Sequence, residues 1–269
     1  MRKFAITAAV GLVGISFVTA GANAADLRRR PAPAPYVPPL FTWTGFYAGI
    51  NAGYGFGNDN NATTVGQVAI NNATVAAGAR PANVGLRPEG FIGGGQIGYN
   101  WQTGAWVTGI ETDIQYTDFK DNVNAVTTAV VAFPGVRNNV FDQKLDYLGT
   151  LRGRLGYAWD RTLIYGTGGL AYGGVKTSVN FFGPQPGNVL QFTGGHDSTE
   201  VGYAVGGGIE QAFWQNVSLR AEYLYYNLGD TSVNVNVIPG SGGVGTGYIT
   251  TFKNEGHIVR GALNFKFGM

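Results

Sequence analysis

The sequence predicts an all-β protein, an eight-stranded antiparallel transmembrane β-barrel with short periplasmic turns and four long extracellular loops. Three observations lead to this prediction. Apolar and polar residues alternate with a period of two through much of the chain. Beyond the N-terminal segment, no window approaches the roughly 18 consecutive apolar residues that a membrane helix needs. The connections between the alternating segments are, in turn, long and short.

Residues 1–24 are predicted to be a secretory signal peptide. Two basic residues at positions 2 and 3 precede a mostly apolar run, which ends in the small-x-small cleavage site Ala22-Asn23-Ala24. Cleavage between Ala24 and Ala25 starts the mature chain at Ala25. A transmembrane anchor is the alternative, but the apolar run is short for an anchor and rich in glycine and alanine.

Residues 25–43 are predicted to be a periplasmic linker. Its first part, ADLRRRPAPAPYVPP, contains three consecutive arginines and five prolines. Proline lacks an amide donor and favours the extended polyproline II conformation, so the segment is a semi-rigid spacer. At ~3.1 Å per residue, its roughly 17 residues reach on the order of 50 Å.

Residues 44–269 are predicted to form the barrel. In the segment 105–119, for example, Trp106, Ile110 and Ile114 share one face of a strand, whereas Glu111 and Asp113 share the other. Four further segments separate their faces in this way, and three more strands are expected, of which the glycine-rich 161–177 has no assigned faces. The expected strands are 44–57, 90–101, 105–119, 145–159, 161–177, 201–213, 217–225 and 259–267.

The connections between these strands alternate in length. Tight turns are expected at 102–104, 159–161 and 214–216, and long polar connections at 58–89, 119–143, 181–198 and 230–253. Bacterial outer-membrane barrels have short periplasmic turns and longer external loops, so both termini are expected in the periplasm. A soluble β-sandwich has no need for this regular alternation. Aromatic residues of the kind that form interfacial girdles lie near the strand ends: Trp43, Tyr47, Tyr99, Trp101, Tyr157, Trp159 and Trp214.

The polar faces of the expected strands carry charges of both signs. Eight strands enclose only enough room for their own side chains, so these charges are predicted to pair and fill a narrow lumen. The alternative is a small ion pathway in which the same residues act as a filter. The predicted lumen network consists of Glu111, Asp113, Asp146, Glu210, Glu222, Arg152, Arg154, Arg220, Arg260 and Lys266.

Composition argues against several classes of function. Without the signal peptide, 18 − 2 = 16 basic residues face 16 acidic ones, so no charge excess indicates a nucleic-acid partner. The chain has no cysteine and only two histidines, which leaves little for a metal site. Gly93-x-Gly95-x-x-Gly98 resembles a dinucleotide-binding motif, but no helix is expected to follow it. We therefore expect no enzymatic activity, no cofactor and no metal.

Three stretches of sequence carry a family resemblance. They are FTWTGFYAGINAGYGFG at 41–57, LDYLGTLRGRLGYAWDRTLIYGTGGLAYG at 145–173 and GHIVRGALNFKF at 256–267. With these stretches the chain resembles the alphaproteobacterial small outer-membrane β-barrel family, of the porin-family or heat-stable surface-antigen type, which is similar to the OmpA-like transmembrane barrel. The resemblance covers nearly the whole mature chain and implies a location in the outer membrane of a Gram-negative cell.

The resemblance also implies contacts with the cell envelope. Relatives with a mature Ala-Asp start are thought to have their α-amine joined to peptidoglycan, and Ala25-Asp26 matches this start. An α-amine titrates near pH 7.7–8.0 and is appreciably neutral, whereas a lysine amine is not. The last strand resembles a recognition signal for the barrel assembly machinery, carried by Gly261, Leu263, Phe265 and Phe267.

The sequence therefore predicts a structural outer-membrane barrel that contributes to envelope integrity, with a mature N-terminus suited to attachment to peptidoglycan. A small diffusion channel or a surface-loop binding protein is the alternative function. The expected partners are outer-membrane lipids, the barrel assembly machinery and peptidoglycan, and nucleic acid is not among them.

Overall fold

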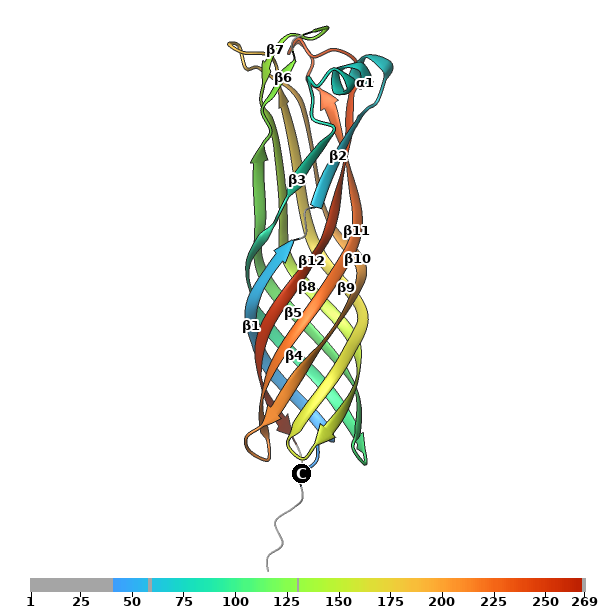
Figure 1. Ribbon diagram of the computed structural model, residues 1–269, viewed down its shortest axis with the longest axis vertical. Coiled ribbons are helices and arrows are strands. Elements are labelled where there is room, and N and C mark those ends of the chain that lie inside the picture. Colours follow the sequence, from blue (N-terminus) through green and yellow to red (C-terminus); the bar gives the residue numbers. More distant parts are fainter. Residues whose placement is uncertain (1–40, 58–59, 130, 268–269) are drawn as a thin grey trace, which may run out of the picture. The chain divides into compact units, whose positions relative to one another are not determined.

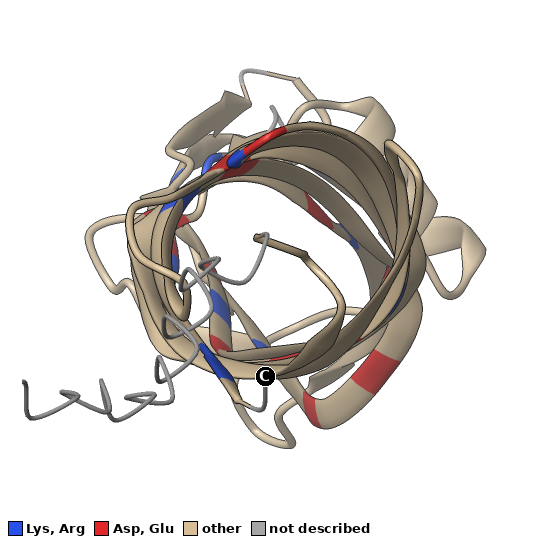
Figure 2. Ribbon diagram, turned by 90° about the horizontal axis from the view of Figure 1, so that it is seen from below, with Lys and Arg blue, Asp and Glu red and all other residues tan. Residues whose placement is uncertain are grey.

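Eight long strands close into a ring (Figures 1 and 2). The computed structural model describes residues 41–57, 60–129 and 131–267. Each strand of the ring pairs antiparallel with its neighbours, and the last strand pairs back to the first, which confirms the predicted fold class. In their order around the ring, the strands are β1 (Gly45–Gly57), β4 (Glu89–Thr103), β5 (Trp106–Asn124), β8 (Asn139–Trp159), β9 (Thr162–Phe182), β10 (Leu190–Ala212), β11 (Val217–Val237) and β12 (Gly247–Phe267).

The two ends of the barrel differ. At one end, here called the terminal end, β1 begins and β12 ends, and short turns join β4 to β5, β8 to β9 and β10 to β11 (Figure 1). Gly104 and Asp160 occupy two of these turns with φ angles of 62° and 50°, a left-handed conformation that glycine and aspartate tolerate. The opposite end, here called the loop end, carries the four longer connections.

The strands extend further toward the loop end than the sequence predicts. The strands β5, β8, β10, β11 and β12 include many of the residues that were expected in loops, at 119–143, 181–198 and 230–253. Beyond a membrane the outer face of a strand meets water, so its sequence lacks the apolar outer face that marks the spanning part. This polar composition made the extensions look like loops.

Two of the loop-end connections contain their own secondary structure. The connection between β1 and β4 holds β2 (Asn60–Gly66), α1 (Ala69–Ala76) and β3 (Asn83–Leu86), and β2 pairs with both β12 and β3. The connection between β5 and β8 holds the hairpin of β6 (Thr127–Ala129) and β7 (Gly135–Arg137). No helix among the described residues is long and apolar enough to cross a membrane.

Two bulges reverse which residues face the lumen. In β8 the buried positions are odd-numbered up to Leu145 and even-numbered from Leu148, and pairing with β5 and β9 shifts between these two residues. An extra residue in one strand turns all following side chains to the other face. Pairing of β11 with β12 shifts in the same way around Gly229, whose φ is 81°.

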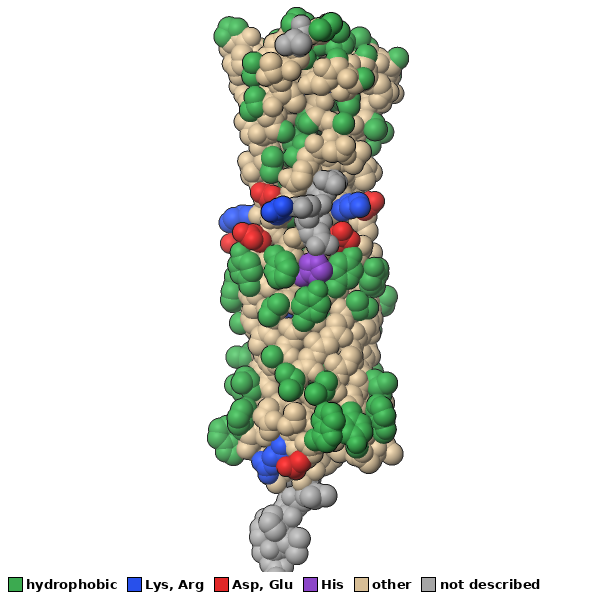
Figure 3. All heavy atoms as spheres, in the orientation of Figure 1, with side chains coloured by type: hydrophobic (Ala, Val, Ile, Leu, Met, Phe, Trp, Pro, Cys, Tyr) green, Lys and Arg blue, Asp and Glu red, His purple; other side chains and the backbone are tan. Residues whose placement is uncertain are grey.

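Large apolar side chains cover the outer wall of the terminal half in a band, and charged residues border the band toward the loop end (Figure 3). Aromatic residues lie at both edges, with Trp101 and Trp159 near the terminal end and Tyr116 and Tyr203 at the other edge. An exposed apolar band with aromatic edges suits a wall surrounded by lipid. Two of the expected girdle residues are exceptions, because Trp43 and Tyr47 are buried inside the barrel.

The interior changes character along the barrel. Near the loop end it is apolar, with a cluster that includes Phe141, Phe181 and Phe252. A second apolar cluster around Phe119 and Leu148 follows toward the terminal end. The charged part of the interior lies within the level of the outer apolar band, between apolar clusters on both sides, and the interior is apolar where the outer wall is polar. The strands therefore alternate throughout, but with opposite polarity in their two halves.

Candidate functional site: the charged lumen

Eight of the ten residues predicted to form a lumen network meet inside the barrel, at the level of the outer apolar band. Residues two positions apart share one face of a strand, so a single strand can supply a pair of charges. Each of the eight is at most 5% exposed, and the four arginines balance the four carboxylates. The members are Glu111 and Asp113 from β5, Arg152 and Arg154 from β8, Glu210 from β10, Arg220 and Glu222 from β11 and Arg260 from β12.

Arg152 lies at the centre of the network. Its Nη2 atom is 2.8 Å from Oε1 of Glu111 and 2.9 Å from Oδ2 of Asp113, and its Nη1 atom is 3.3 Å from Oε1 of Glu222. Arg260 contacts two of the same carboxylates, with its Nη2 atom 2.9 Å from Asp113 and 2.5 Å from Glu222. Asp113 is therefore shared by these two guanidinium groups, and Glu222 by both of them and, at 3.9 Å, by Arg220.

A second part of the network lies on its terminal side. Nη1 of Arg220 is 2.6 Å from Oε2 of Glu111, and Nε of Arg220 is 3.3 Å from Oε2 of Glu210. Arg154 joins through its Nη2 atom, 3.0 Å from the same Glu210 oxygen. The other oxygen of Glu210 accepts hydrogen bonds from Ser218 and Asn264. Charge pairing of this extent offsets the cost of burying so many ions.

Two buried tyrosines complete the network. The hydroxyl of Tyr47 donates a hydrogen bond to Oε2 of Glu111, and the hydroxyl of Tyr165 donates one to Oε1 of Glu222. The donor–acceptor distance is 2.7 Å in each bond. The guanidinium carbon of Arg154 lies 4.0 Å from the centroid of the Tyr165 ring, a cation–π contact. These tyrosines link the carboxylates to β1 and β9, two of the three ring strands that supply no charged residue to the network.

Sequence reasoning missed both tyrosines. Tyr47 was expected in an outer girdle, and the faces of 161–177, which include Tyr165, were unassigned. One signal was available, because Phe46 and Tyr47 are adjacent in an alternating strand and cannot both face lipid. Glycine makes room for the rings, since a Cβ atom at Gly98 would lie 2.4 Å from the hydroxyl oxygen of Tyr47, and one at Gly208 would lie 2.7 Å from that of Tyr165.

The structure contradicts the prediction that Asp146 belongs to the lumen network. The bulge in β8 turns its side chain to the outer wall, just beyond the apolar band, where it is about a quarter exposed. Its carboxylate oxygens lie 2.6 Å from Nζ of Lys144 and 2.9 Å from Nζ of Lys176. Hydrogen bonds from these two ammonium groups hold the pKa of Asp146 below its usual range.

Lys266 also lies outside the ion-pair network, at the terminal mouth of the lumen. Its Nζ donates to the carbonyl oxygen of Thr42 and lies 4.8 Å from the centroid of the Phe41 ring. No ion pair joins it to a carboxylate in the part of the chain that the structure describes. The carbonyl oxygen of Thr42 and the ring of Phe41 are neutral, and the sequence of β12 alone does not show which groups lie at this level.

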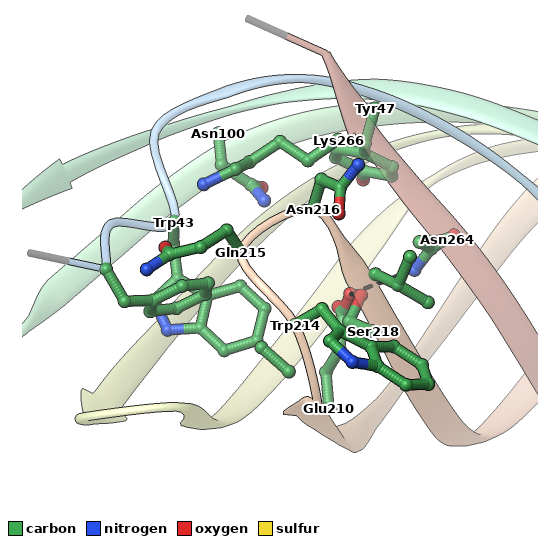
Figure 4. Close-up of a pocket in the computed structure, with 13 residues that line it drawn as sticks. Trp43, Tyr47, Asn100, Glu210, Trp214, Gln215, Asn216, Ser218, Asn264 and Lys266 are labelled. Carbon is green, nitrogen blue, oxygen red and sulfur yellow. Dashed lines mark hydrogen bonds between the residues drawn. The ribbon is translucent and has the colours of Figure 1, made fainter. Parts of the chain in front are cut away.

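The terminal mouth is closed by side chains (Figure 4). Phe41 and Trp43, from the end of the stretch expected to be a linker, line it together with Trp214 and Gln215, and Trp43 packs in an apolar cluster with Leu163. The free space among these side chains is about 20 Å³, enough for roughly one water molecule. The barrel is thus filled below the charged network as well as above it.

The profile of the family described as "Outer membrane protein beta-barrel domain" matches residues 11–249. The chain belongs to this outer-membrane β-barrel family. It is 35% identical over 250 residues to the 31 kDa outer-membrane immunogenic protein of Brucella melitensis, and this alignment covers 91% of this chain and 93% of that protein. It is 31% identical over 228 residues to the 22 kDa outer membrane protein of Rhizobium leguminosarum, and this alignment covers 80% of this chain and 82% of that protein.

A solved structure shares the barrel fold. OprG from Pseudomonas aeruginosa superposes with a TM-score of 0.50 at 14% identity and covers 86% of this chain and 100% of that chain. Family membership confirms the resemblance noted in the sequence and the outer-membrane location. The names of these relatives are those of outer-membrane proteins and not of enzymes, in agreement with the expected lack of enzymatic activity.

The remaining predicted residues lie at the two ends of the mature chain. Gly261, Leu263, Phe265 and Phe267 are exposed on the outer face of β12 near the terminal end, where Leu263, Phe265 and Phe267 add to the apolar band. The signal cleavage position and the Ala25-Asp26 pair fall outside the described residues.

Proposed function

We propose that this outer-membrane barrel is a structural, non-conducting component of the envelope. The observation that carries the proposal is the filled lumen, in which eight paired charges lie between apolar clusters on both sides. Phe119, Leu148 and Ile258 belong to the cluster on the loop side. Val107 and Leu163 belong to the cluster on the terminal side.

Electrostatics favours a closed lumen over an ion pathway. An ion that crossed the barrel would have to separate a buried guanidinium such as Arg152 from three carboxylates. Removing one partner of a buried ion pair costs about 3–5 kcal/mol, because the charge left behind stays in a region of low dielectric constant. Several such contacts lie across the lumen, so their combined separation opposes steady conduction.

Single-channel recording in planar bilayers tests this proposal. The purified barrel is inserted into the bilayer, and its folding is checked by the difference in SDS-gel migration between unheated and boiled samples. We expect no steady conductance from folded barrel at concentrations where a general porin gives regular steps. Reproducible unitary conductance would contradict the proposal and support the diffusion-channel alternative.

We also propose that both termini face the periplasm. Short turns at the terminal end and longer connections at the loop end support this orientation, because outer-membrane barrels place their short turns in the periplasm. In this orientation Phe41, which follows the proline- and arginine-rich segment, lies on the side of the membrane that faces the cell wall. Lipids of the outer membrane would then surround the apolar band, and the exposed end of β12 would be presented to the barrel assembly machinery.

The third part of the proposal is attachment of the mature N-terminus to peptidoglycan, which would join the outer membrane to the cell wall. Its support is the Ala25-Asp26 start and a spacer of suitable length. Mass spectrometry of peptides released by muramidase from SDS-boiled cell walls tests it, and a peptide that begins at Ala25 and carries a muropeptide mass is expected. Free Ala25 peptides alone, at good coverage, would contradict the attachment and leave the structural barrel unaffected.

A further inference from the structure

All four loop-end connections meet at one cavity of about 270 Å³. Thr74 and Arg80 come from the connection between β1 and β4, and Arg137 comes from the connection between β5 and β8. Pro184 and Val244 come from the other two connections. A cavity to which every loop contributes is a place where loops on a rigid scaffold can bind a ligand.

The charge of this cavity is one-sided. The four loop-end segments 60–86, 123–141, 178–195 and 231–252 contain no aspartate or glutamate, and Arg80 and Arg137 are their only lysine or arginine residues. Both arginines line the cavity, and they are only 3% and 9% exposed. Two buried positive charges therefore share a site in segments that carry no negative charge.

The contacts of the Arg80 guanidinium with other described residues are all to neutral groups. Its Nη1 atom is 2.9 Å from Oδ1 of Asn139 and 2.7 Å from the carbonyl oxygen of Phe182, and its Nη2 atom is 3.1 Å from Oε1 of Gln191. The guanidinium carbon also lies 5.1 Å and 5.5 Å from the ring centroids of Phe181 and Phe192. These contacts fix the direction of the guanidinium group but leave its charge uncompensated.

Arg137 is held in a similar way by its own hairpin. Its Nη1 atom is 2.9 Å from the carbonyl oxygen of Phe133 and 3.2 Å from that of Gly135, and its Nη2 atom is 3.4 Å from that of Pro134. Among the described residues, no ion pair joins Arg80 or Arg137 to a carboxylate, in contrast to the four arginines of the lumen.

Burial without a counter-charge has an electrostatic cost. It lowers the pKa of Arg80 to about 10, and the positive charge of Arg137 acts in the same direction. A bound anion would reverse this effect, since guanidinium groups form strong charge-assisted hydrogen bonds with carboxylate and phosphate oxygens. The walls beside the arginines are aromatic, with Phe133, Phe192 and Tyr248 around the same space.

We propose that this loop-end cavity binds a small organic anion, with its acidic group at Arg80 and Arg137 and its apolar body against the aromatic walls. The volume of about 270 Å³ lies near the lower end of the roughly 300–1,000 Å³ of small-molecule pockets, which suits a ligand with one ring and one acidic substituent. The lumen network plays no part in this binding, so the cavity adds a function to the structural role.

Isothermal titration of the folded mature protein in detergent with sodium benzoate tests the proposal. Benzamide has the same shape without the charge, and sulfate has the charge without the ring. We expect benzoate to bind about tenfold or more tightly than either, because each comparison removes one half of the recognition. Equal binding of benzoate and benzamide, equal binding of benzoate and sulfate, or no binding of benzoate would overturn the proposal.

Variants locate the site. Arg80→Gln and Arg137→Gln are each expected to weaken benzoate binding about tenfold or more. Arg87→Gln removes the same charge from an exposed position and is expected to leave benzoate binding unchanged. Arg80→Lys keeps the charge and is expected to retain part of the affinity. If Arg80→Gln disturbs the loops, the result for Arg137→Gln decides, because the hydrogen bonds of the Arg137 guanidinium to described residues all go to carbonyls of its own hairpin. Unchanged binding in folded Arg137→Gln would contradict the site.

Discussion

Arg220 donates a hydrogen bond to Glu111 across the lumen, with 2.6 Å between Nη1 and Oε2. The two residues lie on β11 and β5, which are opposite each other in the ring of eight strands. Hydrogen bonds between neighbouring strands close the wall of the barrel, whereas this ion pair connects walls that never touch along their backbones. The charged network therefore acts as an internal brace across the part of the barrel that carries the outer apolar band.

Replacement of Arg220 tests the brace. Arg220→Met leaves Glu111 and Glu210 with fewer partners in a buried site, and we expect the free energy of unfolding to fall by about 3–5 kcal/mol. Urea unfolding in lipid or detergent, followed by tryptophan fluorescence, measures the change. Arg87→Met is the matched control at an exposed position, with an expected change of about 1 kcal/mol or less. Similar losses in both variants would contradict a buried brace.

Asp113 and Asp146, which the sequence pattern places together in the lumen, are expected to contribute differently to the free energy of unfolding. Asp113→Asn removes a charge that Arg152 and Arg260 share inside the barrel, so we expect a loss of about 3–5 kcal/mol in unfolding free energy. Asp146→Asn removes a charge from the outer wall, where an ion pair contributes about 1 kcal/mol or less. Equal losses in the same unfolding assay would indicate that both carboxylates face the lumen.

The pH dependence of Asp146 follows from its lysine partners. Hydrogen bonds from Lys144 and Lys176 lower the pKa of this carboxyl in the folded protein, so its stabilising effect is present above the unfolded value of about 3.9 and is lost as the pH falls through the lower folded value. Carbon-13 NMR of labelled aspartate should show this carboxyl titrating below its ordinary pKa. Lys144→Met should move the pKa upward, and an unchanged titration would rule out the pairing.

A glycine in β4 tests the packing of the lumen. Gly98→Val would place a Cβ atom 2.4 Å from the Tyr47 hydroxyl oxygen and 2.6 Å from the carbonyl oxygen of Ile110, and overpacking of this kind costs about 1–3 kcal/mol. Gly95→Val, in the same strand, would meet only the carbonyl oxygen of Gly49 at 3.6 Å. We expect a lower unfolding midpoint in urea for the first variant and little change for the second. The reverse order would show that the interior has spare room at Tyr47.

The end of β12 offers a test of the proposed assembly signal. Phe267→Ala is expected to reduce the amount of folded barrel in the outer membranes of cells but not its refolding into detergent, because the signal acts on the assembly machinery. Phe46 pairs with Phe267 across β1 and β12 and is exposed on the same apolar wall, so Phe46→Ala removes a similar contact as a control. Equal loss of cellular insertion in both variants would indicate a general effect of apolar area.

The number of ring strands, their alternation and most of the charged lumen could be predicted from the amino-acid sequence alone. A lipid environment requires this alternation, because every membrane-spanning strand must place apolar residues outward and so leaves polar residues inward. The pattern is visible within a few neighbouring residues of the sequence. Glu111 and Asp113 or Arg152 and Arg154 could be assigned to the lumen for this reason. The family profile then supports the outer-membrane location that the strand pattern and the predicted signal peptide indicate.

Tertiary structure decided the features that depend on register between distant strands. The bulge in β8 moves Asp146 to the outer wall, and the level at which Lys266 enters the lumen brings it to Thr42 and Phe41 and into no ion pair with a described carboxylate. The meeting of Arg80 and Arg137 likewise joins two loops that are far apart in the sequence. Alternation fixes only the face of each residue within its own strand, whereas an extra residue or the stagger of a partner strand sets which side chains meet.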